Sequence, residues 1–422
     1  MMRKSFWLGW LCVMLLGSCK KELQILDKET TTQLPNFGNV KLDEVFGGNE
    51  NKHADSDSIN AVIQHYYRTV WEGGDLWGGF LIAKGDDILY EGYRGFAQAN
   101  KQEPITQSTP LHVASISKTI TAMAVMKLVE AGKLDLDAEV EKYFPGFPYP
   151  GVTVKSLLTQ RSGLPKYEYF IEKIEPAPAE LSKKFLTNRD ILNLMIRHKP
   201  EAARSPDTGF MYCNTNYAML ALLVEKVTAT SFPSAMEQMV FKPLKMENSF
   251  IFQEKDTLTA SKSFFNRGPK VYPYDRLDLI YGDKNVYTTP RDLLNFSRAL
   301  YADNFLRKDL KDMVFEPYSN ERAGINNYGI GFRMKVYDNG NKLTFHTGWW
   351  HGTNSVFAHL LNSNVTIVAI GNKFSRQPYT ALSLAGLFGQ YPIEIDRLKN
   401  TMKQGSGASS GSEEDSADVN GG

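Results

Sequence analysis

Apolar positions along the chain repeat with two periods, and these periods predict where helices and strands lie. From Asp57 the apolar residues recur at intervals of three and four, which predicts an amphipathic helix ending near Val70. Residues 121–131 are good helix formers with two charged side chains, and Gly132 follows where a helix would end. That segment predicts a buried helix.

Strand patterns occur at both ends of the chain, with helical patterns between them. Residues 78–83 and 88–97 are β-rich runs joined by a hairpin connection. Residues 187–302 mostly follow the helical spacing, and Thr289-Pro290-Arg291-Asp292 opens one of these helices with an N-cap, a proline and an acid. Strand character returns in four runs, at residues 329–337, 342–347, 355–361 and 365–371. A last helix is expected around residues 379–388. This order predicts one mixed α/β (α+β) domain whose sheet is assembled from both terminal parts.

The first nineteen residues have the pattern of an export signal. A basic start at Arg3 and Lys4 precedes an apolar run too short to span a membrane, and Leu16-Gly17-Ser18-Cys19 closes it. This ending resembles a bacterial lipobox, in which the cysteine is lipidated and becomes the first residue of the mature chain. We expect a signal peptide over residues 1–18 and an envelope lipoprotein, facing the periplasm or in the outer membrane. An ordinary cleaved signal or a short anchor is the alternative.

The domain boundaries follow from changes in composition. Residues 19–56 are polar and mixed in charge, which predicts a flexible tether between the lipid and the folded body. Residues 57–395 are expected to form the folded domain, with a mostly helical insertion at about 135–285. Residues 396–422 are rich in Gly, Ser, Asp and Glu and are expected to be disordered.

Composition narrows the classes of partner and cofactor. The chain has 422 residues, 42% hydrophobic and 23% charged, with a formal net charge of +1, so no basic excess indicates a nucleic-acid partner. Cys213 would be the one thiol left after lipidation of Cys19, and a single thiol cannot form an internal disulfide. The seven histidines show no zinc-binding spacing, so we expect no metal and no cofactor. Oligomeric state is left open.

Candidate chemistry begins with Ser115 and Lys118, which lie three residues apart at the start of the predicted buried helix. A serine hydroxyl needs a base, and a lysine can act as that base only if its amine is kept neutral. Such a pair also occurs by chance. Two further clusters support it: Tyr212-Cys213-Asn214 precedes an apolar helix, and His346-Thr347-Gly348 ends a predicted strand, just before Trp349.

In this order the three clusters resemble the motifs of the serine β-lactamase and penicillin-binding protein superfamily, most closely its class C-like branch of serine hydrolases. Those motifs are S-x-x-K, Y-x-N and a K-T-G-type triplet on an edge strand. The resemblance covers about residues 58–390. It implies a β-lactamase/transpeptidase-like fold: an antiparallel sheet from both terminal parts, flanked by helices, with a mostly helical subdomain.

The resemblance also implies roles for individual residues. Ser115 would be the acylated nucleophile, Lys118 its proton acceptor, and Tyr212 a second base or the acid that protonates the leaving group. The N–H groups of Ser115 and Trp349 would form the oxyanion hole. Asn214 would hydrogen-bond Lys118 and the substrate's amide. The residues implied for substrate binding are Asn214, His346, Thr347, Gly348 and Trp349.

One departure from the motif limits the expected substrates. The triplet's usual lysine is His346 here, and histidine is mostly neutral at pH 7, so efficient β-lactam hydrolysis is in doubt. We therefore expect a serine hydrolase that cleaves a small ester, amide or D-amino-acid peptide, some derived from the cell wall. The alternatives are a β-lactamase or D-Ala-D-Ala carboxypeptidase and, from another class, a non-catalytic cell-wall-binding lipoprotein.

Overall fold

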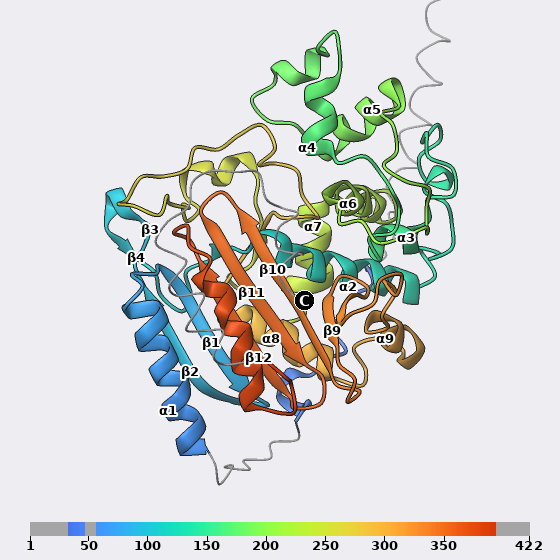
Figure 1. Ribbon diagram of the computed structural model, residues 1–422. Coiled ribbons are helices and arrows are strands. Elements are labelled where there is room, and N and C mark those ends of the chain that lie inside the picture. Colours follow the sequence, from blue (N-terminus) through green and yellow to red (C-terminus); the bar gives the residue numbers. More distant parts are fainter. Residues whose placement is uncertain (1–32, 47–55, 394–422) are drawn as a thin grey trace, which may run out of the picture. The chain divides into compact units, whose positions relative to one another are not determined.

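The computed structural model describes residues 33–46 and 56–393, and its central feature is a seven-stranded sheet (Figure 1). The strand order is β2-β1-β12-β11-β10-β9-β8, with antiparallel neighbours throughout. Its strands are β1 (Gly78–Lys84), β2 (Asp87–Arg94), β8 (Asn326–Tyr328), β9 (Arg333–Val336), β10 (Lys342–Trp350), β11 (Thr353–Leu360) and β12 (Val365–Gly371). Because β1 pairs with β12 along its whole length, the prediction of one sheet built from both terminal parts is confirmed.

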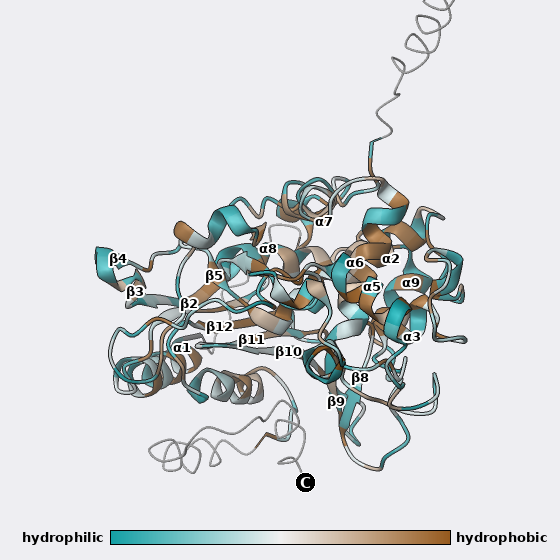
Figure 2. Ribbon diagram, turned by 90° about the horizontal axis from the view of Figure 1, so that it is seen from above, coloured by the Kyte–Doolittle hydropathy of each residue, from teal (hydrophilic) through white to brown (hydrophobic). Residues whose placement is uncertain are grey.

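Helices cover both faces of the sheet (Figure 2). Helix α1 (Ser56–Tyr66), the π-helical turn η2 (Tyr67–Glu72) and the 3-10 helix η10 (Gln377–Leu387) cover one face. Helices α8 (Pro290–Tyr301) and α2 (Ser117–Glu130) lie on the other. Trp71 and Phe80 are among the fully buried side chains of the first face, and each such side chain contributes about 1.5–3 kcal/mol by leaving water.

The remaining helices lie mostly between α2 and α8 in the sequence. They are α3 (Val154–Leu158), α4 (Tyr167–Phe170), α5 (Asn188–His198), α6 (Asn214–Thr228) and α7 (Phe232–Met236), and α9 (Lys308–Val314) follows α8. The helix predicted at Thr289 is confirmed, because Thr289 accepts from the Asp292 N–H and Pro290 takes the first position.

Short elements complete the fold, and the periodicity of the sequence does not predict them. Strands β5 (Leu111–His112), β7 (Val286–Thr288) and β6 (Phe250–Ile251) form a small sheet, and β3 (Phe96–Gln98) pairs with β4 (Glu103–Pro104). The short helical turns are η1 (Leu42–Glu44), η3 (Ala99–Lys101), η4 (Ala114–Ile116), η5 (Val140–Lys142), η6 (Ile171–Lys173), η7 (Ala179–Ser182), η8 (Glu237–Phe241) and η9 (Glu254–Leu258). Residues 250–251 and 286–288 thus differ from the helical pattern of their surroundings, since two or three residues are too few to show a period.

Residues 35–46 form a strap that packs against the folded domain. Phe37 is fully buried and stacks on Phe305, with ring centroids 4.3 Å apart, and its N–H donates to the Met239 carbonyl at 3.1 Å. Asn39 and Asn304 exchange side-chain to backbone hydrogen bonds of 2.7 Å. The strap therefore differs from the flexible tether predicted there. The predicted signal peptide, most of the predicted tether and the whole predicted tail lie outside the described residues.

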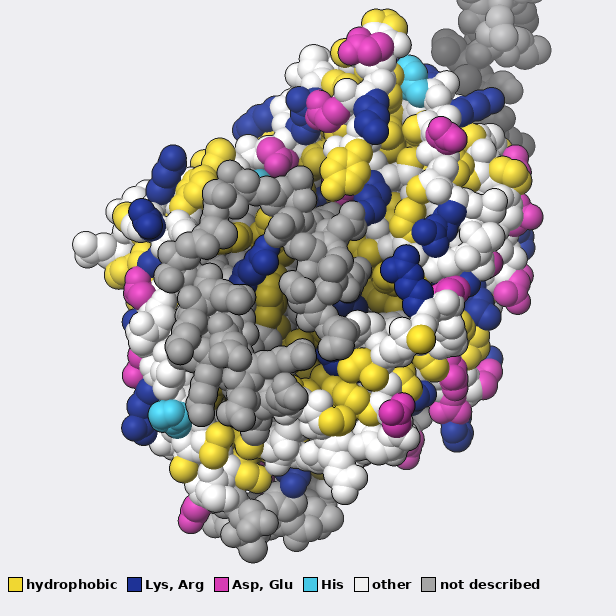
Figure 3. All heavy atoms as spheres, viewed as in Figure 1, with side chains coloured by type: hydrophobic (Ala, Val, Ile, Leu, Met, Phe, Trp, Pro, Cys, Tyr) yellow, Lys and Arg dark blue, Asp and Glu magenta, His cyan; other side chains and the backbone are white. Residues whose placement is uncertain are grey.

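The described surface agrees with the near-neutral composition. On the face shown in Figure 3, lysine and arginine side chains lie among acidic, polar and hydrophobic ones. Within residues 33–46 and 56–393, no helix has the length and apolar character needed to cross a membrane.

Candidate active site

Ser115 lies in the turn η4, immediately before α2, and the backbone of this turn is held from two sides. The preceding residue, Ala114, has a left-handed backbone with φ of +47°, a conformation that costs a residue with a Cβ roughly 1–2 kcal/mol. The Val113 N–H donates to the Val286 carbonyl at 3.1 Å, and the Val113 carbonyl accepts from Ser355 Oγ at 2.8 Å. Strands β7 and β11 thus hold the strained turn that presents the serine.

Lys118 is the second residue of α2 and is fully buried. Its Nζ donates to Ser115 Oγ at 3.0 Å and to the backbone carbonyl of Asp283 at 2.9 Å. At that distance a proton can pass directly from the hydroxyl to the amine. The predicted pairing of Ser115 with Lys118 is therefore present in the structure.

Tyr212 lies just before α6, with an amine and a guanidinium close to its ring. Lys118 Nζ lies 4.9 Å from the ring centroid, and the guanidinium carbon of Arg333 lies 4.7 Å from it. Nearby cations stabilise negative charge on a phenol oxygen, which a proton acceptor requires. The His346 ring completes this wall, with its centroid 6.2 Å from that of Tyr212.

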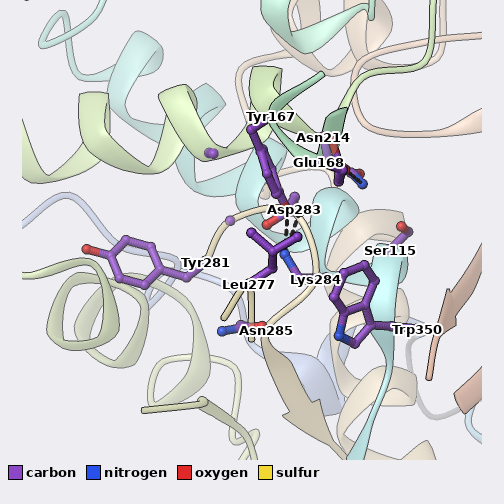
Figure 4. Close-up of polar contacts among 12 residues, drawn as sticks. Ser115, Tyr167, Glu168, Asn214, Leu277, Tyr281, Asp283, Lys284, Asn285 and Trp350 are labelled. Carbon is purple, nitrogen blue, oxygen red and sulfur yellow. Dashed lines mark hydrogen bonds and ion pairs between the residues drawn. The ribbon is translucent and has the colours of Figure 1, made fainter. Parts of the chain in front are cut away.

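Asn214 is the first residue of α6 and is buried. Its Nδ2 donates to Oε1 of Glu168 in α4, and Figure 4 shows the two side chains together. Lys118 and the substrate amide are the partners predicted from the sequence. The structure adds the Glu168 carboxylate to this side of the site, half-buried in the segment that follows Ser162-Gly163-Leu164.

The triplet His346-Thr347-Gly348 lies on β10, beyond the stretch Lys342–Phe345 that pairs with β9. A Cβ placed on Gly348 would lie 2.3 Å from the Val113 carbonyl oxygen and 3.1 Å from the Ser115 nitrogen. Glycine at this position therefore lets β10 run directly against the turn that carries Ser115. Thr347 and Trp349 are half-buried on either side of Gly348, and the oxyanion role of the Trp349 N–H stays a prediction.

His346 differs from the substrate ligand that the sequence predicts. It is fully buried, and burial together with the charges of Arg333 and Lys118 holds its pKa well below the usual range. Its Nδ1 lies 2.7 Å from the Thr347 carbonyl and therefore donates, so Nε2 is unprotonated and accepts from the Tyr328 hydroxyl at 3.4 Å. Both ring nitrogens face protein atoms. The structure places His346 as a neutral support behind the site.

Arg333, which the sequence does not single out, places a permanent positive charge near the triplet. It opens β9, pairs with Phe345 in the sheet and is half-buried with its guanidinium over Tyr212. The sequence feature that could have identified Arg333 is its position directly after the glycine-containing stretch Gly329-Ile330-Gly331-Phe332, which precedes the last strands. A basic residue at the start of a strand is common, so only the strand pairing reveals its place.

A second group of polar residues lies near the end of β10. Asp275, Asp278 and His351 have ligand atoms within 4.8 Å of one another, an arrangement that could hold a metal. Asp278 Oδ1 already accepts from Trp350 Nε1 at 2.6 Å and lies 2.9 Å from His351 Nε2. These contacts satisfy the Asp278 carboxylate without an ion, so we assign this group no metal-binding role.

Comparison with known proteins agrees with this geometry. The family model described as "Beta-lactamase" matches residues 64–386. Penicillin-binding protein 4* of Bacillus subtilis (strain 168) is 28% identical over 357 residues, covering 79% of this chain and 77% of the relative.

Solved structures give the same result. A penicillin-binding protein from Bacillus halodurans matches with a TM-score of 0.67 and 27% identity, covering 77% of this chain and 99% of that one. A D-amino acid amidase from Ochrobactrum anthropi SV3 shares the fold, with a TM-score of 0.63 and 20% identity, covering 82% and 99% of the two chains. The family match spans most of the domain that holds Ser115 and Lys118 at hydrogen-bond distance, and the chain therefore belongs to the β-lactamase family of serine hydrolases.

Proposed function

We propose that this hydrolase forms an acyl-serine at Ser115 and cleaves small D-amino-acid peptides or amides whose leaving group carries a carboxylate. Lys118 takes the hydroxyl proton as Ser115 Oγ attacks the carbonyl carbon, and Tyr212 protonates the departing nitrogen. Water then attacks the acyl-serine and gives a proton to the Tyr212 phenolate. The bond from the acyl carbon to Ser115 Oγ breaks as Lys118 returns its proton to that oxygen, and the acyl group leaves as a carboxylic acid.

The observation that carries the choice of substrate is Arg333. Its guanidinium lies over Tyr212, the residue assigned to the leaving group, and arginine binds carboxylates with two parallel hydrogen bonds. An anionic leaving group would be held at this point. A simple ester has no such group, so it would be cleaved without this contribution to binding.

The first experiment tests the acyl-serine. The purified protein is incubated with p-nitrophenyl acetate and with D-Ala-D-Ala peptides, and turnover and intact mass are measured. We expect hydrolysis and a mass adduct in the wild type, and neither in Ser115→Ala. Absence of both in the wild type would contradict the proposal.

A second experiment tests the carboxylate contact with Arg333→Met. We expect KM for the D-Ala-D-Ala peptide to rise about 10- to 100-fold, matching about 1.5–3 kcal/mol for a hydrogen bond to a charged group, with less than a threefold change for p-nitrophenyl acetate. Arg307→Met is the matched control, because Arg307 is exposed and pairs with Asp309. An equal loss on both substrates would contradict the assigned contact.

Two alternatives become outcomes of these assays. Penicillins also carry a carboxylate, and the similarity to Penicillin-binding protein 4* of Bacillus subtilis supports testing a penicillin. Labelling of Ser115 by a fluorescent penicillin at low concentration would favour a penicillin-recognising enzyme. Binding of peptidoglycan that is unchanged in Ser115→Ala, with no turnover of any acyl substrate, would favour a non-catalytic binding lipoprotein.

We also propose that the chain is exported and anchored through lipid on Cys19, facing the periplasm or in the outer membrane. The support is the basic start, the apolar run and the Leu-Gly-Ser-Cys ending. Mass measurement of the membrane-extracted protein should show loss of residues 1–18 and added acyl chains. Cys19→Ala should leave the precursor unprocessed, and recovery of wild type without lipid would contradict the anchor.

A further inference from the structure

Asp283 and Lys284 form a buried ion pair next to the catalytic lysine, and the mechanism above gives their side chains no part. Asp283 is 0% exposed and Lys284 is 2% exposed, in the loop that leads into β7. Removing charges from water costs several kcal/mol per ion, and the attraction between the two repays this only with good geometry. Stability alone therefore explains such a pair poorly.

The backbone of this loop is attached to α2 at three successive points. The Asp283 carbonyl accepts from Lys118 Nζ at 2.9 Å, the Gly282 carbonyl accepts from Thr121 Oγ1 at 2.8 Å, and the Val286 N–H donates to Ser117 Oγ at 3.0 Å. The loop thus lies along the helix turn that carries the catalytic amine. Where the Asp283 carbonyl lies determines where that amine can lie.

The side chains of the pair connect this loop to the surrounding walls (Figure 4). Asp283 Oδ2 accepts from the Tyr167 hydroxyl at 2.7 Å and lies 3.2 Å from Lys284 Nζ, which also donates to the Tyr167 hydroxyl. Lys284 Nζ lies 4.6 Å from the ring centroid of Trp350 at the end of β10. Its backbone carbonyl is 2.5 Å from His112 Nε2.

We propose that Lys284 is a positioning residue for acylation: with Tyr167 it fixes Asp283, so that the Asp283 carbonyl holds the Lys118 amine against Ser115 Oγ. The inference rests on the proposed function and adds a group to it that touches neither substrate nor serine. The contact of Lys284 with Trp350 connects this group of residues to the end of β10.

Other titratable groups around Lys284 do not replace this partnership. Burial lowers the pKa of His112 to about 4, so its ring is neutral near pH 7. Asp275 interacts with the Lys284 charge at a distance. Asp278 accepts a hydrogen bond from Trp350 Nε1, and Lys284 Nζ lies over the ring of that tryptophan. Asp283 supplies the negative charge in direct contact.

The test compares Lys284→Met, Lys284→Arg and the double variant Asp283→Asn/Lys284→Met, which leaves no lone buried charge. Pre-steady-state release of p-nitrophenol gives the acylation rate per active site, and its pH profile is recorded for each variant. We expect acylation to slow about 10- to 100-fold in both Met variants, because misplacing a catalytic group by about 1 Å has an effect of that size. The substrate concentration that gives a half-maximal burst rate should change less than threefold, the pH profile should shift, and Lys284→Arg should recover part of the rate.

Lys262→Met is the matched control, because Lys262 is a half-buried lysine that packs over an aromatic ring, that of Tyr274, at 4.9 Å. Its acylation rate should equal that of the wild type. Unchanged rate and pH profile in both Met variants, or a lower melting temperature with an unchanged rate per active site, would overturn the inference. If Lys284→Met does not fold, the double variant decides. Wild-type protein that is never acylated would contradict the proposed function itself.

Discussion

Gly348 shows how a single residue determines the geometry of the site. A Cβ there would meet the Val113 carbonyl oxygen at 2.3 Å and Ser355 Oγ at 2.4 Å, and both of those atoms belong to the hydrogen bond that holds the nucleophile turn. Real Cβ atoms do not approach so closely, so any side chain would move β10 away from Ser115. The absence of a side chain is therefore a condition for activity.

Gly348→Ala should lower kcat/KM about 10²- to 10³-fold, the range seen when one oxyanion donor is lost. Steady-state kinetics on p-nitrophenyl acetate would measure it. Gly386→Ala is the control, because a Cβ at Gly386 would lie 3.9 Å from its nearest neighbour, in ordinary contact. Activity of Gly348→Ala within threefold of wild type would show that β10 can move without harm.

Residues of the site differ in how far the sequence predicts them. Ser115 and Lys118 are found because they lie three residues apart, in a helical turn and the helix that follows it, and this spacing brings their side chains together. Arg333 and Lys284 reach the site through strand pairing and a loop; the stretch at residues 329–332 directly before Arg333 is a weak signal, and Lys284 has no adjacent motif. His346 is found as a departure from a motif, but its burial depends on Tyr328 and on sheet register, which the sequence does not display.

Among the elements, the strap at residues 35–46 packs against the folded domain, and its composition does not predict this packing. Its surroundings are polar and mixed in charge, which predicts a tether, yet Phe37 fills a fully buried position against Phe305. One aromatic residue in a polar segment gives no periodic signal. The long periodic elements are predicted correctly, as with α2 and β12, because each shows its period over several residues.

Phe37→Ala should lower the free energy of unfolding by about 3–5 kcal/mol, the usual loss when a buried aromatic ring is removed. Urea denaturation at pH 7 would measure the change. Leu258→Ala, at a residue 78% exposed, should change it by less than about 0.5 kcal/mol. An equally small effect for Phe37→Ala would mean that the strap contributes little to the folded state.

In the described part of the chain, protonation of three histidines opposes folding: His346 and His359 are fully buried, and His112 is half-buried. Burial lowers the pKa of His112 to about 4 and that of His359 to about 3, and His346 is also held well below its usual value. In the unfolded chain each would titrate near pH 6.5. Since the folded pKa values are lower, the stabilising contribution of each histidine is fully present above pH 6.5. It is lost as the pH falls towards the folded pKa of that histidine.

Each of these histidines should contribute about 1.4 kcal/mol per pH unit to the slope of stability between about pH 6 and pH 4.5. Denaturant titrations at a series of pH values would measure that slope. His359→Gln should reduce it by about one such increment, whereas His65→Gln, at an exposed position, should leave it unchanged. A slope that is the same in His359→Gln and wild type would contradict the assignment.

Pairing of β1 with β12 along their whole length affects when the active site is completed during folding. These strands come from opposite ends of the folded sequence, and such distant pairings form slowly. Ser115 lies in the early part of the chain, whereas Gly348 and the β10 edge that complete its surroundings lie in the late part. The surroundings that the proposed function requires of the Ser115 hydroxyl are therefore complete only when the last strands are in place.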